Sequence, residues 1–253
     1  MIGPQESTAL LIGNWELLVT RLRGTILRGS GVTSLFANVP LAFFNVSALD
    51  TPTPTSADFR RALTLVKERA AACPHPSLVA ISQGWIPANW LDLAAEVGFS
   101  PAVHLTAMDA TEVLPPTRPL PDLAFHRATT AAVATDLALI NAHAYGLPVE
   151  QFDCMFNLNL WNSDTIGVTG SIAGQAVTAA AIFPVAGTAY AAFVATLPAH
   201  QGKGYAEAAL RHAIAHADTK RITMHATELG SPIYLRMGFT PGEKTVLLSR
   251  IRP

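Results

Sequence analysis

The six residues from Gln201 to Ala206, QGKGYA, could together bind an anion. Gly202 and Gly204 flank Lys203 directly before an alanine-rich run that predicts a helix. Backbone N–H groups at a helix start lack intrahelical partners, and the helix dipole favours negative charge there. Glycine lets a phosphate approach the backbone closely, Lys203 adds a positive charge, and Ala206 keeps the first turn small. The pattern predicts a site for a pyrophosphate.

Two common nucleotide sites and a zinc site fit this region poorly. A nucleoside-triphosphate loop requires a Ser or Thr directly after its lysine, and none follows Lys203. The sequence also lacks the third glycine of the dinucleotide-binding fingerprint. His212 and His216 are four residues apart and share a helical face, but Ala213 stands where the zinc motif has a glutamate. We therefore expect two surface histidines and no metal.

The elements that must position the loop alternate between strands and helices. We expect strands at 123–128, 165–173, 175–184, 188–197, 221–227 and 244–251, and helices at 131–146, 204–217 and around Tyr234. No charged residue lies between Asp164 and Lys203, but the turn residues at 184–187 favour a hairpin of two buried strands over a membrane span. The pattern predicts a mixed α/β fold.

The first half repeats this order in shorter form, with a strand at 40–49, a helix at 56–71 and a strand at 76–83. Each half ends with a similar segment, EVGFSPAVHLTAM or RMGFTPGEKTVLL, in which a helix end is followed by Gly-Phe, a Ser/Thr-Pro turn and a strand. Gly98 and Gly238 are both expected as left-handed helix caps. We predict a tandem duplication. The expected domains are 1–115 and 122–253, joined by a proline-rich linker at 116–121.

Composition restricts the possible partners and the compartment. Only 14% of the 253 residues are charged and the net charge is −1, so no basic field attracts nucleic acid or an anionic membrane. Cys73 and Cys154 are too few for a disulfide framework. The N-terminus has no basic leader, and Gly13 and Asn14 interrupt its apolar run. We expect a cytoplasmic protein.

The order strand, LPAHQGKGYA, helix, strand, YLRMGF resembles the GCN5-related N-acetyltransferase (GNAT) family. That family's signature is Gln or Arg, two residues of any type, Gly, any residue, then Gly or Ala, which Gln201, Gly204 and Ala206 satisfy. The resemblance is close over the last half and extends to the first half only in fold order. It implies α/β architecture with two GNAT-like domains in tandem, each a mostly antiparallel mixed sheet flanked by helices. The first lacks the glycine-rich loop, and we expect it to be degenerate.

The resemblance also implies acetyl-CoA as co-substrate, without a metal. The implied pyrophosphate contacts are Gln201, Gly202, Lys203, Gly204, Tyr205 and Ala206, and the backbone at Val194, Ala195 and Thr196 would line the acetyl-pantetheine arm.

Acetyl transfer needs an amine to attack a thioester, donors for the oxyanion, and an acid for the departing thiolate. Ser231 can cap a short helix that Pro232 begins, which places Tyr234 in the first turn at the spacing of the family's general acid. Alternatively, the Tyr234 ring only packs in the core. Glu228 is the first candidate for a base that deprotonates the amine.

Other residues leave alternatives open. Glu150, Asp153, His143 or a water relay could replace Glu228 as the base. An aromatic cluster could line an acceptor pocket or be ordinary core, and it comprises Phe152, Met155, Phe156 and Trp161.

The expected function is transfer of an acetyl group from acetyl-CoA to a primary amine of a small molecule or peptide by direct attack, in a monomer or homodimer. A non-catalytic acyl-CoA-binding sensor or interaction module is the alternative. The acceptor and the acyl chain length stay open, because acceptor pockets come from variable loops.

Overall fold

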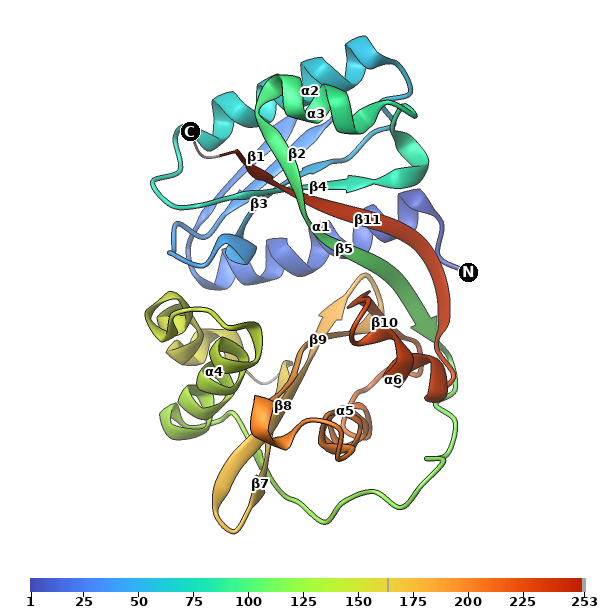
Figure 1. The fold of residues 1–253 in the computed structure, drawn as a ribbon. Helices are drawn as coiled ribbons and strands as arrows, with labels where there is room; N and C mark the ends of the chain where they lie inside the picture. Colours follow the sequence, from blue (N-terminus) through green and yellow to red (C-terminus); the bar gives the residue numbers. More distant parts are fainter. Residues whose placement is uncertain (163, 252–253) are drawn as a thin grey trace. The chain divides into compact units, whose positions relative to one another are not determined.

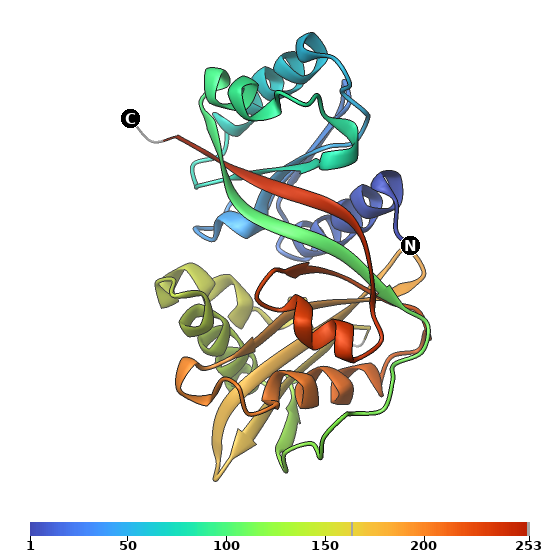
Figure 2. The same cartoon turned by 45° about the vertical axis from the view of Figure 1, so that its right-hand side comes forward.

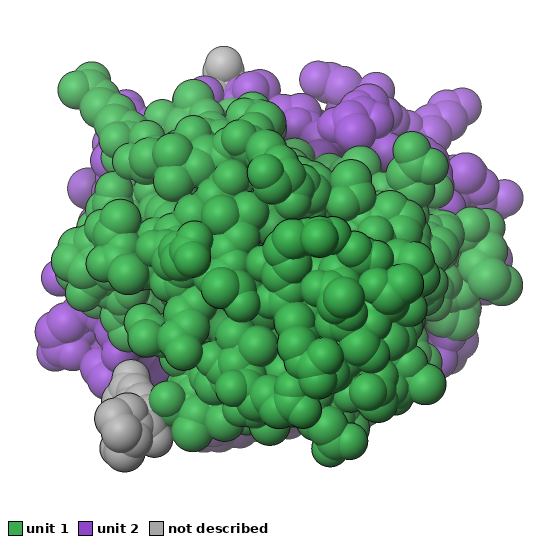
Figure 3. Space-filling view, turned by 90° about the horizontal axis from the view of Figure 1, so that it is seen from above, with its two compact units in different colours: residues 1–108, 225–232, 240–253 green, residues 109–224, 233–239 purple. Residues whose placement is uncertain are grey.

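The computed structural model describes residues 1–162 and 164–251, which form two compact units, coloured separately in Figure 3. Unit 1 contains residues 1–108, 225–232 and 240 onward, and unit 2 contains 109–224 and 233–239. The units interleave along the chain, because the last strand belongs to unit 1 although unit 2 precedes it.

Unit 1 is built around mixed strands with the hydrogen-bonded order β1-β2-β3-β4-β11-β5 (Figure 1). Its strands are β1 (Thr25–Gly29), β2 (Val32–Phe36), β3 (Asn45–Leu49), β4 (Leu78–Ser82), β5 (Phe99–Ala110) and β11 (Thr240–Arg250). Its helices are α1 (Pro4–Arg21), α2 (Ser56–Ala70) and α3 (Trp90–Val97), with short 3₁₀ segments at Ala42–Phe44 and Gln83–Trp85. The C-terminal strand β11 pairs antiparallel with β4 from the first half of the chain.

Local sequence explains the central crossover of unit 1. The Thr55 hydroxyl accepts a hydrogen bond from the Asp58 amide at 3.1 Å, which caps α2. Phe59, Leu63 and Val66 recur at helical spacing and are buried in the core with strands β4 and β11. Strands β3 and β4 are consequently parallel neighbours joined by α2.

In unit 2 the hydrogen-bonded strand order is β10-β9-β8-β7-β6. Its strands are β6 (Ala124–Arg127), β7 (Ile166–Ile172), β8 (Gln175–Val185), β9 (Thr188–Thr196) and the first part of β10 (Ile222–Thr227). Its helices are α4 (Ala131–Tyr145), α5 (Tyr205–Ile214) and the larger part of α6 (Ser231–Arg236), with 3₁₀ segments at Val149–Phe156, Leu158–Trp161 and Pro198–His200. Strands β9 and β10 are parallel and joined by α5, as β3 and β4 are by α2 in unit 1.

The expected elements of the second half are confirmed, including the hairpin at 184–187, where Val185 pairs with Thr188. Gly98 and Gly238 are both left-handed, with φ of +95° and +92°. Within the described ranges no helix is long and apolar enough to cross a membrane.

The expected domain limits, 1–115 and 122–253 with a linker at 116–121, stay a prediction about the duplication. The compact units have other limits than the expected domains, because strand β11 from the second half of the chain belongs to unit 1, where it pairs with β4.

Candidate active site

The glycine-rich loop of unit 2 connects strand β9 to helix α5, as the sequence predicts. Gly204 is the N-cap of α5 and has φ of +85°, and Gly202 has φ of +76°, a region that residues with a Cβ rarely adopt. A Cβ built on Gly202 meets no atom within 4 Å. The backbone on this side of the loop is therefore open to a ligand.

Two side chains of the loop bond to its own backbone. Gln201 Nε2 donates to the Thr196 carbonyl oxygen at 3.3 Å, which ties the loop to the end of β9. Lys203 Nζ lies 3.4 Å from the Ala199 carbonyl oxygen and remains exposed. Gln201 therefore shapes the loop, whereas Lys203 keeps a charge available to an anion.

Arg118 is a second cation at the loop, and sequence reasoning missed it. Its Nη2 lies 3.2 Å from the position of a Cβ built on Gly204. No hydrogen bond or ion pair joins its guanidinium to another of the described residues. Arg118 belongs to the segment that connects β5 to β6, drawn as a thin green trace in Figure 2, and lies beside Gly204 at the start of α5. Arg118 and Gly204 are 86 positions apart, so nothing in the sequence indicates that they lie close together.

Contacts further along α5 hold this segment. Arg211 Nη1 donates to the Leu114 carbonyl oxygen at 2.7 Å, and the Leu114 amide donates to the Met237 carbonyl oxygen at 2.9 Å. Arg211 also forms an ion pair with the buried Glu207 at 2.9 Å. This pairing offsets the charge of Glu207, which would otherwise repel an anion at the helix start.

Strand β9 carries a β-bulge that includes Val194, the first of the three residues predicted to line the acyl arm. Ala179 pairs with Ala195 and Ala181 with Ala192, so that Phe193 and Val194 together oppose one residue of β8. Phe193 has φ of +52°. A bulge leaves a residue outside the ladder and redirects the backbone groups next to it. Beyond it, the Thr178 hydroxyl donates to the Ala195 carbonyl oxygen at 2.8 Å.

Tyr234 lies in α6 and is 7% exposed. Its ring makes an edge contact with Phe239, at a centroid distance of 6.0 Å. Burial, and in second place the neighbouring Tyr145, raise the pKa of the Tyr234 hydroxyl well above its ordinary value. The hydroxyl stays protonated at neutral pH and can donate, although the ring also packs as core.

The base candidates are exposed and lie apart along the chain. Glu228 follows β10 in the part of the chain that belongs to unit 1, whereas Tyr234 belongs to unit 2. Glu150, Asp153 and His143 are exposed in unit 2. The role of Glu228 stays a prediction.

Most of the aromatic cluster proposed for an acceptor pocket belongs to the core. Phe152 and Met155 are buried, and so is Trp161, which donates from Nε1 to the Met155 carbonyl oxygen at 2.8 Å. The described ranges contain no group of three or more potential metal ligands, and the expectation about His212 and His216 stays a prediction. Instead, His212 stacks on Phe125 with ring centroids 4.2 Å apart.

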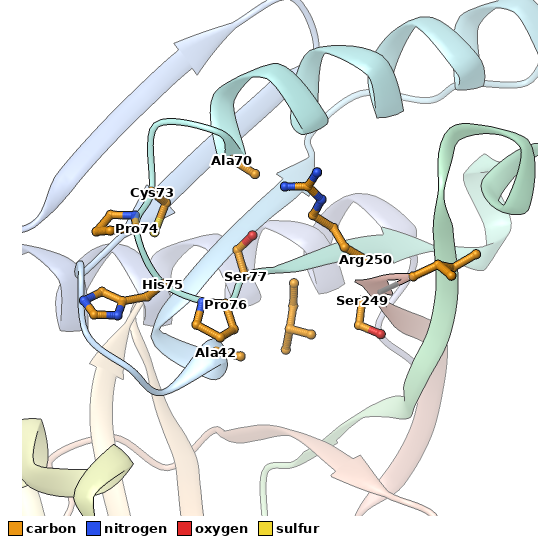
Figure 4. A pocket seen from close by; sticks show the side chains of 11 residues that line it. Ala42, Ala70, Cys73, Pro74, His75, Pro76, Ser77, Ser249 and Arg250 are labelled. Carbon is orange, nitrogen blue, oxygen red and sulfur yellow. The ribbon is translucent and has the colours of Figure 1, made fainter. Parts of the chain in front are cut away.

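A hollow of about 630 Å³ lies in unit 1 and involves none of the predicted site residues (Figure 4). It is bounded by the segment at 73–78, Ala42, the end of α2 and the end of β11, with His75, Ser77 and Arg250 as polar lining. The glycine-rich loop contributes nothing to it.

Comparison with known proteins supplies independent information. A sequence model described as an acetyltransferase (GNAT) domain matches residues 164–241, which include β9, the loop, α5 and Tyr234. No curated protein matches the chain.

Solved structures resemble the chain over nearly its whole length. A GCN5-related N-acetyltransferase from Kribbella flavida has a TM-score of 0.70 at 17% identity and covers 97% of this chain and 96% of its own. One from Sphaerobacter thermophilus has a TM-score of 0.56 at 16% identity, with 88% of this chain and 78% of its own covered. A GCN5-related N-acetyltransferase-like protein from Streptococcus suis has a TM-score of 0.54 at 15% identity and 98% coverage of both chains. At these identities the likeness concerns the fold.

Proposed function

Because residues 164–241 match an acetyltransferase (GNAT) domain, we propose that the protein is an acyltransferase that transfers an acetyl group from acetyl-CoA to a primary amine. The acceptor is a small molecule or a peptide, and the protein acts as a monomer or homodimer. A cytoplasmic location is part of the proposal and rests on the two free cysteines, Cys73 and Cys154.

The residues at the loop fit the diphosphate of this co-substrate. Gly202 leaves room beside the backbone, and the amides at the start of α5 offer donors. Lys203 and Arg118 supply two cations for a group that carries at least two negative charges. When bound, acetyl-CoA supplies the thioester from which the acetyl group leaves.

The remaining chemistry is assigned to this chain's own groups. The backbone at Val194, Ala195 and Thr196 would line the acetyl-pantetheine arm, and the N–H of Val194, which lies in the bulge, would stabilise the oxyanion that forms when the amine attacks. The Tyr234 hydroxyl would donate a hydrogen bond to the departing sulfur, and Glu228 would accept the proton that the amine loses.

One observation carries the proposal most strongly. The bulged strand β9 and the left-handed glycine turn before α5 follow one another within the segment that matches the GNAT domain. The first is suited to a carbonyl that develops negative charge, and the second to a phosphate, so together they match the two ends of an acyl-CoA arm.

Calorimetric titration with acetyl-CoA, followed by free-thiol release against a panel of amines, tests the proposal. The panel contains amino acids, polyamines, amino sugars and short peptides. Binding together with acceptor-dependent release supports the enzyme. Absence of binding contradicts the site itself.

Binding without release over the panel would instead favour the rival function, a non-catalytic acyl-CoA sensor. The exposed charge and open backbone of the loop suit both functions equally, whereas only the enzyme needs Tyr234.

Gly204→Glu tests the step that both functions share. The substitution adds a carboxylate where the diphosphate is expected and places it beside Arg118, which it would neutralise. We expect loss of acetyl-CoA binding of at least about 100-fold in calorimetry, or about 2.7 kcal/mol.

Gly174→Glu is the matched control. Gly174 has φ of +79° in the turn between β7 and β8, so the backbone strain and the charge change are similar to those at Gly204. A Cβ at Gly174 meets no atom within 4 Å, whereas a Cβ at Gly204 meets Arg118. Equal affinity of both variants would contradict the assignment of the loop.

A further inference from the structure

The bulge of strand β9 places a phenylalanine in a backbone conformation that it does not adopt readily. Phe193 has φ of +52°, in the left-handed region where a Cβ is unfavourable. Such a conformation persists only where the surroundings hold it. The contacts of Phe193 therefore show what fixes the bulge.

The ring of Phe193 is held by aromatic neighbours. It makes edge contacts with Phe183 at a centroid distance of 5.9 Å and with Trp161 at 6.4 Å. These contacts fix the side chain but not the direction of the peptide that follows it.

Asn141 of helix α4 reaches the carbonyl of that peptide. Its Nδ2 donates to the Leu137 carbonyl oxygen at 2.9 Å and lies 3.5 Å from the Phe193 carbonyl oxygen, at the long limit of a hydrogen bond. Two acceptors on one side fix the orientation of the amide. The same peptide carries the Val194 N–H, so its plane decides where that donor points.

The Asn141 side chain lowers the stability of the fold at this position compared with an apolar side chain of the same shape. The residue is fully buried, and its Oδ1 has no hydrogen-bond partner among the described residues. A buried unpaired acceptor destabilises the fold, and an apolar side chain of the same shape avoids this penalty. The amide therefore has a role beyond packing.

We infer that Asn141 is a positioning residue, which holds the Phe193–Val194 peptide so that the Val194 N–H is directed at the thioester carbonyl. This inference rests on the proposed function and adds a residue that touches neither the co-substrate nor the acceptor. The side chain acts only through the bulge.

Asn141→Leu tests this role with three readouts. We expect kcat in the thiol-release assay to fall at least roughly tenfold, because an oxyanion donor is misdirected. The Kd for acetyl-CoA stays within twofold, because the loop at Gly202 and Gly204 is untouched. The midpoint of thermal unfolding stays the same or rises, because the unpaired acceptor is removed.

Infrared difference spectra of bound acetyl-CoA, labelled with ¹³C at the acetyl carbonyl, report the donor directly and need no acceptor. In the unmodified protein the carbonyl stretch should lie at lower frequency than in water. Asn141→Leu should return it toward the frequency in water.

Asn14→Leu is the matched control. Asn14 is also a buried helical asparagine whose Oδ1 lacks a partner, but it lies in α1 of unit 1. It should leave the carbonyl frequency and kcat unchanged.

An unchanged carbonyl frequency in Asn141→Leu overturns the inference, and so does a fall in kcat that merely parallels losses of affinity and stability. If the unmodified protein binds acetyl-CoA without turnover, the proposed enzymatic function is wrong, and the carbonyl frequency alone tests the positioning role of Asn141. Absence of binding rejects both.

Discussion

Tyr234 keeps its proton at neutral pH because burial raises the pKa of its hydroxyl, and this determines how it could assist acyl transfer. A thiol has an ordinary pKa of about 8.5, so full transfer of the tyrosine proton to a thiolate would be uphill. A hydrogen bond to the developing thiolate needs no such transfer. The buried hydroxyl therefore suits a donor that stabilises the leaving group as it departs.

Tyr234→Phe should lower turnover by roughly 100-fold and change the Kd for acetyl-CoA by less than about twofold. Stopped-flow thiol release and calorimetry measure the two quantities. Tyr190→Phe is the control, because Tyr190 is also buried in unit 2 with a raised pKa. Equal turnover of the Tyr234→Phe variant and the unmodified protein would leave Tyr234 as a core residue.

His225 links the stability of unit 1 to pH. Its Nε2 lies 2.9 Å from the hydroxyl of Ser7, and burial lowers the pKa of the imidazole to about 3. An unfolded histidine has a pKa of about 6.5, so between these values the unfolded chain binds the extra proton. Stability is therefore fully present above about pH 6.5 and falls as the pH decreases toward 3.

The free energy of unfolding should fall by at most about 1.4 kcal/mol for each pH unit through this histidine. Urea denaturation between pH 7 and pH 4 measures the slope, and His225→Gln should reduce it. An NMR titration midpoint near 6 for His225 in the folded protein would disprove this linkage.

Among the elements, the segment between β5 and β6, which contains Leu114 and the proline-rich residues 116–121, does more than connect two halves. Leu114 is bonded to Arg211 of α5 and to Met237, and Arg118 then lies beside Gly204. The segment therefore belongs to the surroundings of the loop.

Arg118→Gln should weaken acetyl-CoA binding about fivefold, or about 1 kcal/mol, because one exposed cation near the phosphates is lost. Binding of S-acetylpantetheine, which lacks the diphosphate, should not change. Lys220→Gln removes the same charge from another exposed site of unit 2 and serves as control. A loss of S-acetylpantetheine affinity in Arg118→Gln would point to a disturbed fold instead.

Elements with strong local signals could be predicted from the sequence, and those fixed by distant contacts could not. Glycine caps at Gly98 and Gly238 and the turn at 184–187 depend on local chemistry, and the structure confirms them. Helix α1 was missed because buried Asn14 and the adjacent Gly13 interrupt its apolar pattern. Likewise, the bulge at Phe193 follows from the register between β8 and β9, which the sequence does not display.

For the molecule as a whole, the decisive feature is that strand β11 completes the sheet of unit 1. A fragment of residues 1–115 lacks that strand, and Val246 and Leu248 of β11 are part of its core. A cut in the linker therefore does not separate two self-sufficient halves.

Fragments 1–115 and 122–253, each expressed alone, should be largely unfolded by circular dichroism and hydrogen exchange. Mixed during refolding, they should recover the pattern of the intact chain. A folded, monomeric 1–115 fragment would contradict this dependence.

The place of β11 also has a consequence for synthesis. The ribosome makes the chain from its N-terminus, so the first half emerges long before residues 240–250 exist. Until then, one edge of β4 lacks the strand β11 that pairs with it in the folded protein. Val79 and Ile81 also lack the residues of β11 that pack beside them in the core. Most of unit 1 is made first, yet it can reach its final form only after residues 240–250 have been synthesised. During that interval the uncovered strand edge is a site where the nascent chain can aggregate.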